Sequence, residues 1–451
     1  MQEDVLSLVS DIVDRARRLG ADQADAFVTM STESSVRVRL GKVEQIVEAG
    51  SHAASVRVIK DQRTSISSTS DLTPKALDEM VQQAIELAKI SEPDEFAGLP
   101  DRADLAQGTP ANLQLYDERL ESLSIDEMKE SALRCEQAAL DFDRRVTNSD
   151  GGEMGVVRGQ VALANSLGFA SSYPSTSVSL TVEAICDDSE GKKRNDYWFS
   201  AERALHRLES PEDVGRKAAA RAVAKLGARK IETATMAVVW EPRVVAALLG
   251  ILSEAVSGEA LYRRATFLAG LEGEQFASAK FTLTDDPLLA GRLGSRPFDG
   301  EGVTSRTLPL FEAGTFKTFL FDVRNARRLK RRTTGAAQRS LTSAPAPSVS
   351  NLLLQPGDTS PDGLLAGIED GLLLTDLMGF GVNLTTGDFS RGAQGFRIEK
   401  GKLTYPVTEV NVSGNLKDML ASIDAVGDDV AWFGNTQAAS LRMPKLTVSG
   451  L

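Results

Sequence analysis

The sequence predicts an α+β fold: an N-terminal region of helices and antiparallel sheet, then a β-rich C-terminal domain with a helix packed on its sheet. Three observations lead to this prediction. Apolar residues recur at helical spacing at the start of the chain, and alternating segments follow them. The order helix, strands, helix then occurs a second time, and from residue 231 onward short segments rich in glycine and proline replace it. We therefore divide the chain into an α+β unit at 1–90, a linker or irregular wrap at 91–124, a second α+β unit at 125–230 and a β-rich domain at 231–451.

Apolar stripes at helical spacing predict the helices of the N-terminal region. The first stripe stops at Gly20. Two other helices begin with a capping residue followed by proline, which fits the first helical turn, at Thr73-Pro74 and Ser210-Pro211. The expected helices span residues 5–19, 74–90, 125–141 and 211–227.

Alternation of apolar and polar residues predicts the strands between these helices. In the first unit Gly41, Gly50 and the pair Asp61-Gln62 mark turns, so the segments form an antiparallel meander. The strands of the second unit lie between residues 144 and 186. The expected strands of the first unit are 27–39, 42–48 and 51–60, with 63–68 as a weaker fourth.

One clear helix is predicted in the C-terminal domain, directly after a strand at 233–240. Pro242 fits its first turn, and an apolar stripe that ends at Val256 predicts a helix to about Leu261 that packs on the sheet, although Ser257-Gly258 weakens the pattern. Glu254 is two positions from both Leu252 and Val256, so it lies opposite the stripe and fits an ordinary helix glutamate.

The scarcest residues exclude most metal and acid/base chemistry. The 451 residues include two histidines, His52 and His206, and two cysteines, Cys135 and Cys186. A zinc site takes three or four ligands from Cys, His, Asp or Glu, and no partner lies at ligand spacing from either histidine. We expect both histidines at the surface or in ordinary hydrogen bonds. Both cysteines fall on apolar stripes, which favours the core.

Charge and hydropathy exclude further classes of protein. The 51 Lys and Arg residues against 63 Asp and Glu give a net charge of −12, which argues against a partner bound through an overall positive field, such as nucleic acid. No apolar tract long enough for a membrane span and no secretory signal is visible. Two cysteines in such a chain fit a reducing cytosol, so we expect a cytoplasmic protein.

Two polar segments remain as candidates for binding. The basic cluster places six cationic side chains within nine positions, and it fits either a contact with phosphate or an acidic partner, or a solvated face; it comprises Arg324, Arg327, Arg328, Lys330, Arg331 and Arg332. The glycine passage, 379–395, would let a backbone come close to another chain or ligand. Its candidate partner or peptide contacts are Asn383, Thr386, Gly387, Asp388, Ser390 and Arg391.

Three passages carry a resemblance to a known family. Residues 210–230 (SPEDVGRKAAARAVAKLGARK), 298–306 (FDGEGVTSR) and 383–419 (NLTTGDFSRGAQGFRIEKGKLTYPVTEVNVSGNLKDM) resemble the TldD/PmbA family, also called the modulator of DNA gyrase family, over nearly the full length. The resemblance implies a cytoplasmic protein. In this family a TldD-type zinc metalloprotease subunit pairs with a PmbA-type (TldE) subunit, and together they cut unfolded or flexible peptides.

The resemblance also shows which ligands this chain lacks. The TldD-type subunit carries His-Glu-x-x-x-His on the helix after the first strand of its C-terminal domain, and a cysteine ligand near the C-terminus. In this sequence the two histidines correspond to Ser253 and Gly258, the cysteine corresponds to Phe433, and only Glu254 matches. Without metal-bound water Glu254 has nothing to activate as a general base. Positions five apart, such as 253 and 258, point about 140° apart around an ideal helix. The active subunit must therefore distort its helix to bring its two histidines together, and this chain has no evident need of such a distortion.

Three functional hypotheses follow. The first is a non-catalytic PmbA/TldE-type subunit that contains no cofactor, leaves zinc to its TldD-type partner, and holds an unfolded peptide as an added strand on an edge of the N-terminal meander; isolated, it could form a homodimer. The second is a stand-alone modulator that binds a partner such as DNA gyrase or a toxin-antitoxin component through the basic cluster. The third is a carboxylate-only metal site, with a hard cation such as Mg²⁺ held by Glu254, Asp299 and Asp388.

Overall fold

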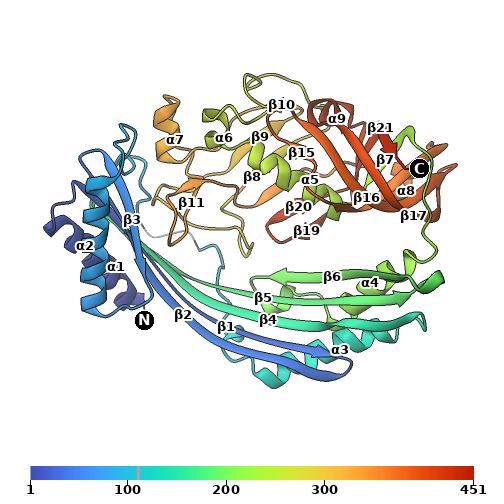
Figure 1. The fold of residues 1–451 in the computed structure, drawn as a ribbon, viewed down its shortest axis with the longest axis horizontal. Coiled ribbons are helices and arrows are strands. Elements are labelled where there is room, and N and C mark those ends of the chain that lie inside the picture. Colours follow the sequence, from blue (N-terminus) through green and yellow to red (C-terminus); the bar gives the residue numbers. More distant parts are fainter. Residues whose placement is uncertain (1, 109–111, 451) are drawn as a thin grey trace.

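The computed structural model describes residues 2–108 and 112–450, and it confirms the α+β prediction. Its N-terminal region forms one antiparallel sheet in the order β3-β2-β1-β4-β5-β6. The sheet is long and curved, and it runs beneath the C-terminal domain in Figure 1. Pairing of β1 with β4 joins the strands of the two α+β units into this single sheet. The strands are β1 (Gln23–Arg39), β2 (Lys42–Lys60), β3 (Arg63–Thr69), β4 (Val146–Asn165), β5 (Ala170–Asp187) and β6 (Lys193–Glu202).

One face of this sheet carries the helices α1 (Gln2–Arg18), α2 (Pro74–Ile90), α3 (Ile125–Leu140) and α4 (Pro211–Ala224). Side chains alternate between the faces of a strand, so even-numbered residues of β1 share one face. Ala24 and Val28 pack with α1 and α2, whereas Val36 and Val38 pack with α3 and α4. The opposite face carries Phe27, which packs against residues of the C-terminal domain.

The turn predicted at Gly50 is wrong. β2 is one strand from Lys42 to Lys60, and Gly50 pairs with Thr32 of β1 inside the ladder. A glycine ends a strand only when the chain turns there, and here β1 pairs with β2 from Lys42 to Ile59, on both sides of Gly50. On the other side β3 pairs only with residues 54–60. Within the described residues, the outer edge of β2 at 42–53 therefore has no strand beside it.

A closed ring of strands forms the centre of the C-terminal domain. The pairing runs β14-β7-β21-β17-β16, and β16 pairs again with β14. Closing the ladder removes the open edges that a sheet otherwise exposes. The ring strands are β7 (Ala234–Trp240), β14 (Asp370–Met378), β16 (Asp388–Glu399), β17 (Lys402–Asn415) and β21 (Leu441–Ser449), with β15 (Val382–Asn383) and β18 (Ala425–Val426) attached.

A second sheet of short strands, in the order β10-β9-β8-β13-β20-β19, belongs to the same domain and shares its apolar core. Its strands are β8 (Leu283–Asp285), β9 (Leu308–Glu312), β10 (Thr315–Phe316), β13 (Leu352–Leu354), β19 (Ala431–Phe433) and β20 (Thr436–Ala438), and β11 (Ala337–Gln338) pairs with β12 (Ala346–Pro347) nearby. The remaining helices are α5 (Pro242–Ala255), α6 (Gly258–Tyr262), α7 (Val323–Arg328), α8 (Pro361–Leu365) and α9 (Leu416–Ser422).

The helix predicted over 242–261 is present but broken. Its stripe is buried in the core of the domain, as predicted, with Leu248, Leu249 and Leu252 fully covered. The chain leaves the helix at Val256, and Ser257 is extended at φ −71° and ψ 131°. The Ser257 hydroxyl accepts a hydrogen bond from the Glu259 N–H at 3.2 Å, so it caps the new helix α6. The expectation that this chain needs no distortion here is therefore wrong.

Buried charges join the sheet to the C-terminal domain. On the sheet, Asp25 accepts a hydrogen bond from Arg57 Nε at 2.8 Å. From the C-terminal domain, Arg339 Nη1 lies 2.6 Å from the other Asp25 oxygen, and Glu301 lies 3.4 Å from Arg57 Nη1. All four side chains are at most 6% exposed. Because isolated charges are costly away from water, these pairs constrain how the two regions meet.

Glu301 makes this junction sensitive to pH. Burial raises its pKa from the ordinary 4.5 to about 8, and the nearby Asp322 and Asp299 add to the rise against the opposing effect of Arg57. Between pH 4.5 and 8 the folded chain therefore holds a proton that the unfolded chain has lost, so this group stabilises the fold less as pH rises. We expect Glu301→Gln to flatten the decline, with the variant gaining on the wild type toward pH 8 and above. Urea unfolding from pH 5 to 9 measures this, and parallel profiles for the two proteins would contradict it.

Candidate functional site

Ser253 and Glu254 lie at the end of α5, beside a hollow of about 420 Å³. The Ser253 hydroxyl donates to the Gly250 carbonyl at 2.7 Å, one turn back along the helix. Glu254 is exposed, as its position opposite the stripe predicts. Leu384 of the glycine passage lines the same hollow, so the tertiary structure brings that passage beside the motif positions. The other lining residues are Ser257, Glu259, Ala260, Arg263, Ala265, Pro347, Ser348 and Val349.

Gly258 is buried at the break between α5 and α6. Its N–H donates to the Leu320 carbonyl at 2.8 Å. A Cβ atom at this position would lie 2.8 Å from the Leu320 oxygen and 2.7 Å from Cε1 of the Phe321 ring, and closer still to Cδ1 of that ring. Close packing therefore requires glycine here. Its backbone conformation does not, because its φ is not positive. The Phe321 ring occupies the space into which a side chain at 258 would extend.

Phe433 has an apolar environment. It ends β19, and its ring makes edge-to-face contacts with Trp198 and Phe199 of β6, at centroid distances of 6.0 and 6.4 Å. It thus packs the C-terminal domain against the end of the curved sheet.

The residues at these positions do not fit a zinc ion. Position 258 has no donor and no room for one, Phe433 has no donor atom, and a serine hydroxyl is a poor zinc ligand at neutral pH. Over residues 2–108 and 112–450 no group of three or more His, Cys, Asp and Glu residues could hold a metal ion. Asp299 is buried and accepts hydrogen bonds from three backbone N–H groups, whereas Asp388 is exposed on β16. The carboxylate-only hypothesis therefore has no assembled site among the described residues.

The glycine passage forms a hydrogen-bonded turn between β15 and β16. The Asn383 side chain accepts from the N–H groups of Thr385 and Thr386 at 3.0 and 3.4 Å. Asn415 donates to the Thr386 carbonyl at 3.0 Å and to Asp388 at 3.2 Å. The Thr386 hydroxyl donates to Asp388 at 2.6 Å, and the Asn411 amide donates to Ser390 at 2.6 Å. Gly387 has a φ of +83°. Arg391 is half-buried, and its Nε has no hydrogen-bond partner among the described residues. Most of these groups stabilise the turn itself.

The basic cluster is paired with carboxylates of the same chain. Arg324 and Arg328 both contact Asp94, at 2.6 and 2.9 Å, and Arg332 contacts Asp104 at 2.6 Å. The other ion pairs are Arg327 with Asp101 at 3.6 Å and Arg331 with Glu272 at 2.6 Å. Three of these acidic residues belong to the segment 91–108, so the cluster holds that segment against the C-terminal domain.

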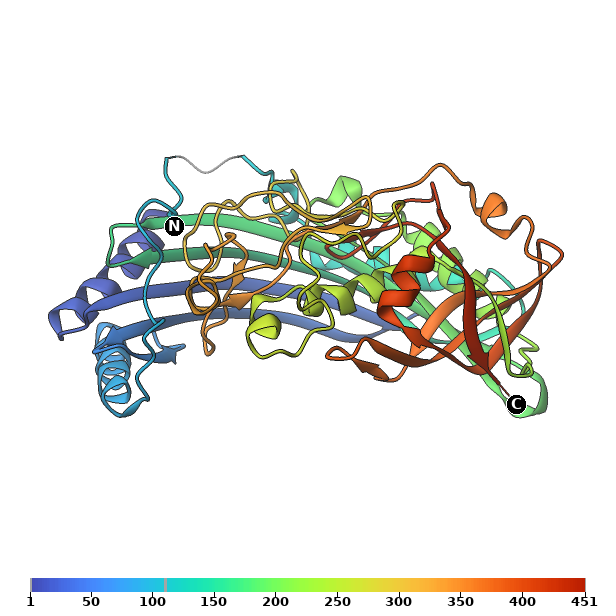
Figure 2. The same cartoon turned by 90° about the horizontal axis from the view of Figure 1, so that it is seen from above.

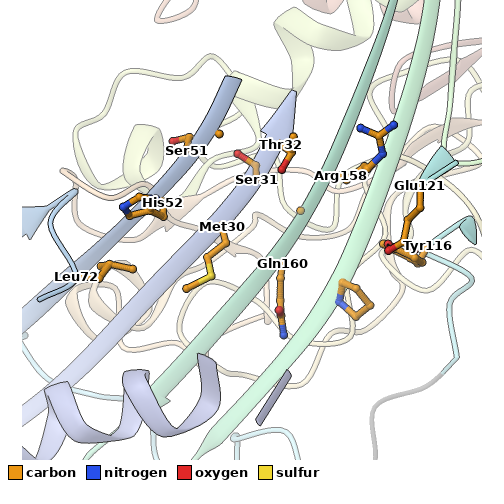
Figure 3. Close-up of a pocket in the computed structure, with 13 residues that line it drawn as sticks. Met30, Ser31, Thr32, Ser51, His52, Leu72, Tyr116, Glu121, Arg158 and Gln160 are labelled. Carbon is orange, nitrogen blue, oxygen red and sulfur yellow. The ribbon is translucent and has the colours of Figure 1, made fainter. Parts of the chain in front are cut away.

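A larger hollow, of about 740 Å³, lies away from all of these positions. It opens on the helix-bearing face of the curved sheet, where Met30, His52 and Gln160 project from neighbouring strands, with Tyr116 and Glu121 at its far side (Figure 3). Burial, and then its hydrogen bond to Glu121, raises the pKa of Tyr116 to about 12. His52 and His206 are both exposed, as expected. Cys135 and Cys186 are buried, as expected, and burial raises their pKa values to about 12 and 11.

Two contributors to these sites are missing from the sequence interpretation. Phe321 belongs to an aromatic run with Phe316 and Phe319, and nothing in that run indicates that its ring packs against Gly258; Arg339 lies in a loop and carries no local signal. A glycine inside an apolar helix pattern, Gly258, was the available signal for a close approach by another part of the chain.

A second view, from above, shows that the C-terminal domain extends along much of the curved sheet (Figure 2).

No helix of the described residues is long and apolar enough to cross a membrane.

Comparison with known proteins covers nearly the whole chain. Models for the PmbA/TldA metallopeptidase match as domain 1 at residues 24–88, as the central domain at 118–226 and as the C-terminal domain at 233–450. A Metalloprotease PmbA homolog of Haemophilus influenzae is 34% identical over 450 residues, covering 100% of this chain and 97% of that protein.

Solved structures show the same architecture. A Bacteroides thetaiotaomicron protein named as a modulator of DNA gyrase superposes with a TM-score of 0.92 at 30% identity, over 99% of this chain and 98% of that one. TldE from Thermococcus kodakarensis superposes with a TM-score of 0.87 at 22% identity, over 98% of this chain and 100% of that one, which indicates a shared fold.

Proposed function

Because the chain belongs to the PmbA/TldD metallopeptidase family, we propose that it is the non-catalytic, PmbA/TldE-type subunit of a cytoplasmic metalloprotease complex. It assembles with a TldD-type subunit that binds the zinc, and the complex cuts or processes unfolded peptides. The observation that carries the proposal is the packing of Phe321 against Gly258. Where the active subunit needs a histidine, this chain has a glycine and a ring in the remaining space.

The broken helix supports the same assignment. Positions 253 and 258 lie on either side of the break between α5 and α6, so the backbone distortion that two ligands five residues apart require is present without the ligands. Here the break is held by backbone pairing of Ser257 with Leu320.

The open edge of β2 is our candidate for peptide binding. Residues 42–53 offer unpaired backbone groups on one side, and Val43 and Ile46 on this segment are 41% and 50% exposed. An extended peptide adds to such an edge through main-chain hydrogen bonds, which accepts many sequences but demands an unfolded segment. Exposed apolar side chains on an open edge otherwise promote aggregation, so an occupant would explain their presence.

Reconstitution tests the proposal. We expect this chain alone to contain no stoichiometric zinc by elemental analysis and to cleave no peptide. Mixed with a TldD-type subunit that keeps His-Glu-x-x-x-His, it should form a heteromer by light scattering and support cleavage of an unfolded peptide. Stoichiometric zinc with cleavage by this chain alone would refute the assignment.

Two variants of this chain refine the reconstitution. Glu254→Gln should leave cleavage by the heteromer unchanged, because Ser253, Gly258 and Phe433 supply no zinc site whose water Glu254 could activate. Ile46→Lys should weaken peptide binding while assembly persists. A matched control, Val157→Lys, changes a similarly exposed apolar residue on the interior strand β4, where both backbone edges are already paired.

The second hypothesis, a stand-alone modulator, depended on a free basic cluster. Five of its six side chains are paired with carboxylates of this chain, which gives the cluster a role within the fold that needs no acidic partner. The first proposal is therefore the better supported.

A further inference from the structure

A small cavity of about 220 Å³ lies between the inner face of the curved sheet and the C-terminal domain. The sheet contributes Phe27, Val161, Leu163 and Tyr173, which form an apolar and aromatic wall. The C-terminal domain contributes Arg296 and Arg339, with Phe298 and Asp299 between them in the lining. The cavity is distinct from the hollow beside Ser253 and Glu254.

Both arginines are left with unsatisfied donors. The Arg339 side chain is 1% exposed; one of its nitrogens faces Asp25, but Nε and Nη2 have no hydrogen-bond partner. Nε and Nη2 of Arg296 are likewise buried without a partner. Leaving a charged donor buried and unpaired costs more than most single interactions contribute, so each such group in a native fold calls for a partner.

The carboxylates nearby do not meet this need. The two Asp299 oxygens accept from the N–H groups of Glu301, Val303 and Ala337, at 2.9 to 3.0 Å. Asp25 is shared between Arg57 and Arg339. Glu301 faces Arg57 at 3.4 Å and does not line the cavity, so it offers no acceptor to Arg296 or Arg339 there.

We propose that this cavity binds a small organic carboxylate, whose oxygens accept from Arg296 and Arg339 and whose apolar body lies against Phe27, Tyr173 and Phe298. Guanidinium groups present paired donors in the planar geometry that a carboxylate accepts. At about 30 Å³ per water molecule the cavity has room for roughly seven, enough for a carboxylate with a short apolar body. The carboxylate is either a free acid or the C-terminus of a peptide. The inference does not depend on the proposed function.

Isothermal titration of the full chain tests this with 3-phenylpropionate as the probe and 3-phenylpropanamide as its uncharged counterpart. We expect the acid to bind and the amide to bind at least tenfold more weakly. Gly-Gly-Phe and its C-terminal amide form the second arm: binding of the free peptide but not of 3-phenylpropionate identifies a chain terminus as the source. Inorganic phosphate should bind more weakly than the preferred carboxylate.

Two variants separate the site from the fold. Arg296→Gln should weaken binding at least tenfold by removing donors. Val161→Phe keeps both arginines but fills the cavity, and it should weaken binding as strongly. Arg263→Gln, at a side chain 69% exposed outside this cavity, should leave the affinity unchanged. Failure of every carboxylate to bind at millimolar concentration, or undiminished binding in Val161→Phe, would overturn the proposal and leave water as the partner of these donors.

Discussion

Replacing Gly258 by alanine should lower the free energy of unfolding by about 1–3 kcal/mol, because the new methyl group would overlap the Phe321 ring and the Leu320 carbonyl. Histidine at this position should cost more, since its ring needs the volume that Phe321 fills. Urea unfolding followed by tryptophan fluorescence measures both changes.

Gly250→Ala is the matched control. It lies on α5, eight residues earlier, where an added Cβ meets nothing within 4 Å. Alanine there should stabilise the chain by about 0.5–1 kcal/mol, the usual gain over glycine inside a helix. In a double-mutant cycle Gly258→Ala with Phe321→Ala should cost less than the sum of the single changes, because the overlap has been removed. Strict additivity would show that Phe321 is not the obstacle.

The same geometry predicts the outcome of restoring the family's ligand set. The triple variant Ser253→His, Gly258→His, Phe433→Cys should bind no stoichiometric zinc, because Phe321 blocks one position and the residue at 433 packs toward Trp198 and Phe199. Tetrahedral zinc coordination needs all its donors at about 2.0–2.3 Å.

Asp25→Asn should destabilise the chain by about 3–5 kcal/mol, the largest effect that we expect from a single change, because it leaves the buried Arg57 and Arg339 without the carboxylate between them. The amide preserves the shape of the side chain, so the loss reports charge and not volume. Asp78→Asn is the control: Asp78 pairs with Arg15 at 2.5 Å, but its side chain is 54% exposed, and the expected cost is at most about 1 kcal/mol. Similar losses in the two variants would mean that the buried pairs do not hold the sheet to the C-terminal domain.

The prediction of the elements succeeded where one short pattern decides the structure. The caps at Thr73 and Ser210 and the stripe of α5 depend on residues within a few positions, and the structure has them. The predicted turn at Gly50 failed because a glycine in a strand depends on the strand beside it, and that strand is distant in sequence. The break at Ser257 depends in the same way on Leu320, 63 positions later in the chain.

The same distinction between local sequence and distant contacts applies to the candidate site. The absence of histidine at 253 and 258 and of cysteine at 433 is visible in the sequence. That the space beside Gly258 is filled, and that Leu384 of the glycine passage lines the hollow beside Ser253 and Glu254, follows only from the packed structure.

The sequence by itself determined the α+β class, the family and the loss of the zinc ligands, because periodicity, caps and motif residues are properties of near neighbours in the chain. Only the tertiary structure decided that the basic cluster is paired, as Arg324 meets Asp94 across 230 positions, and that Arg296 and Arg339 face one cavity with donors unsatisfied. Charged side chains interact through space, so their partners can be far apart in the sequence. Here these partners meet because the C-terminal domain packs against the sheet and against the segment 91–108.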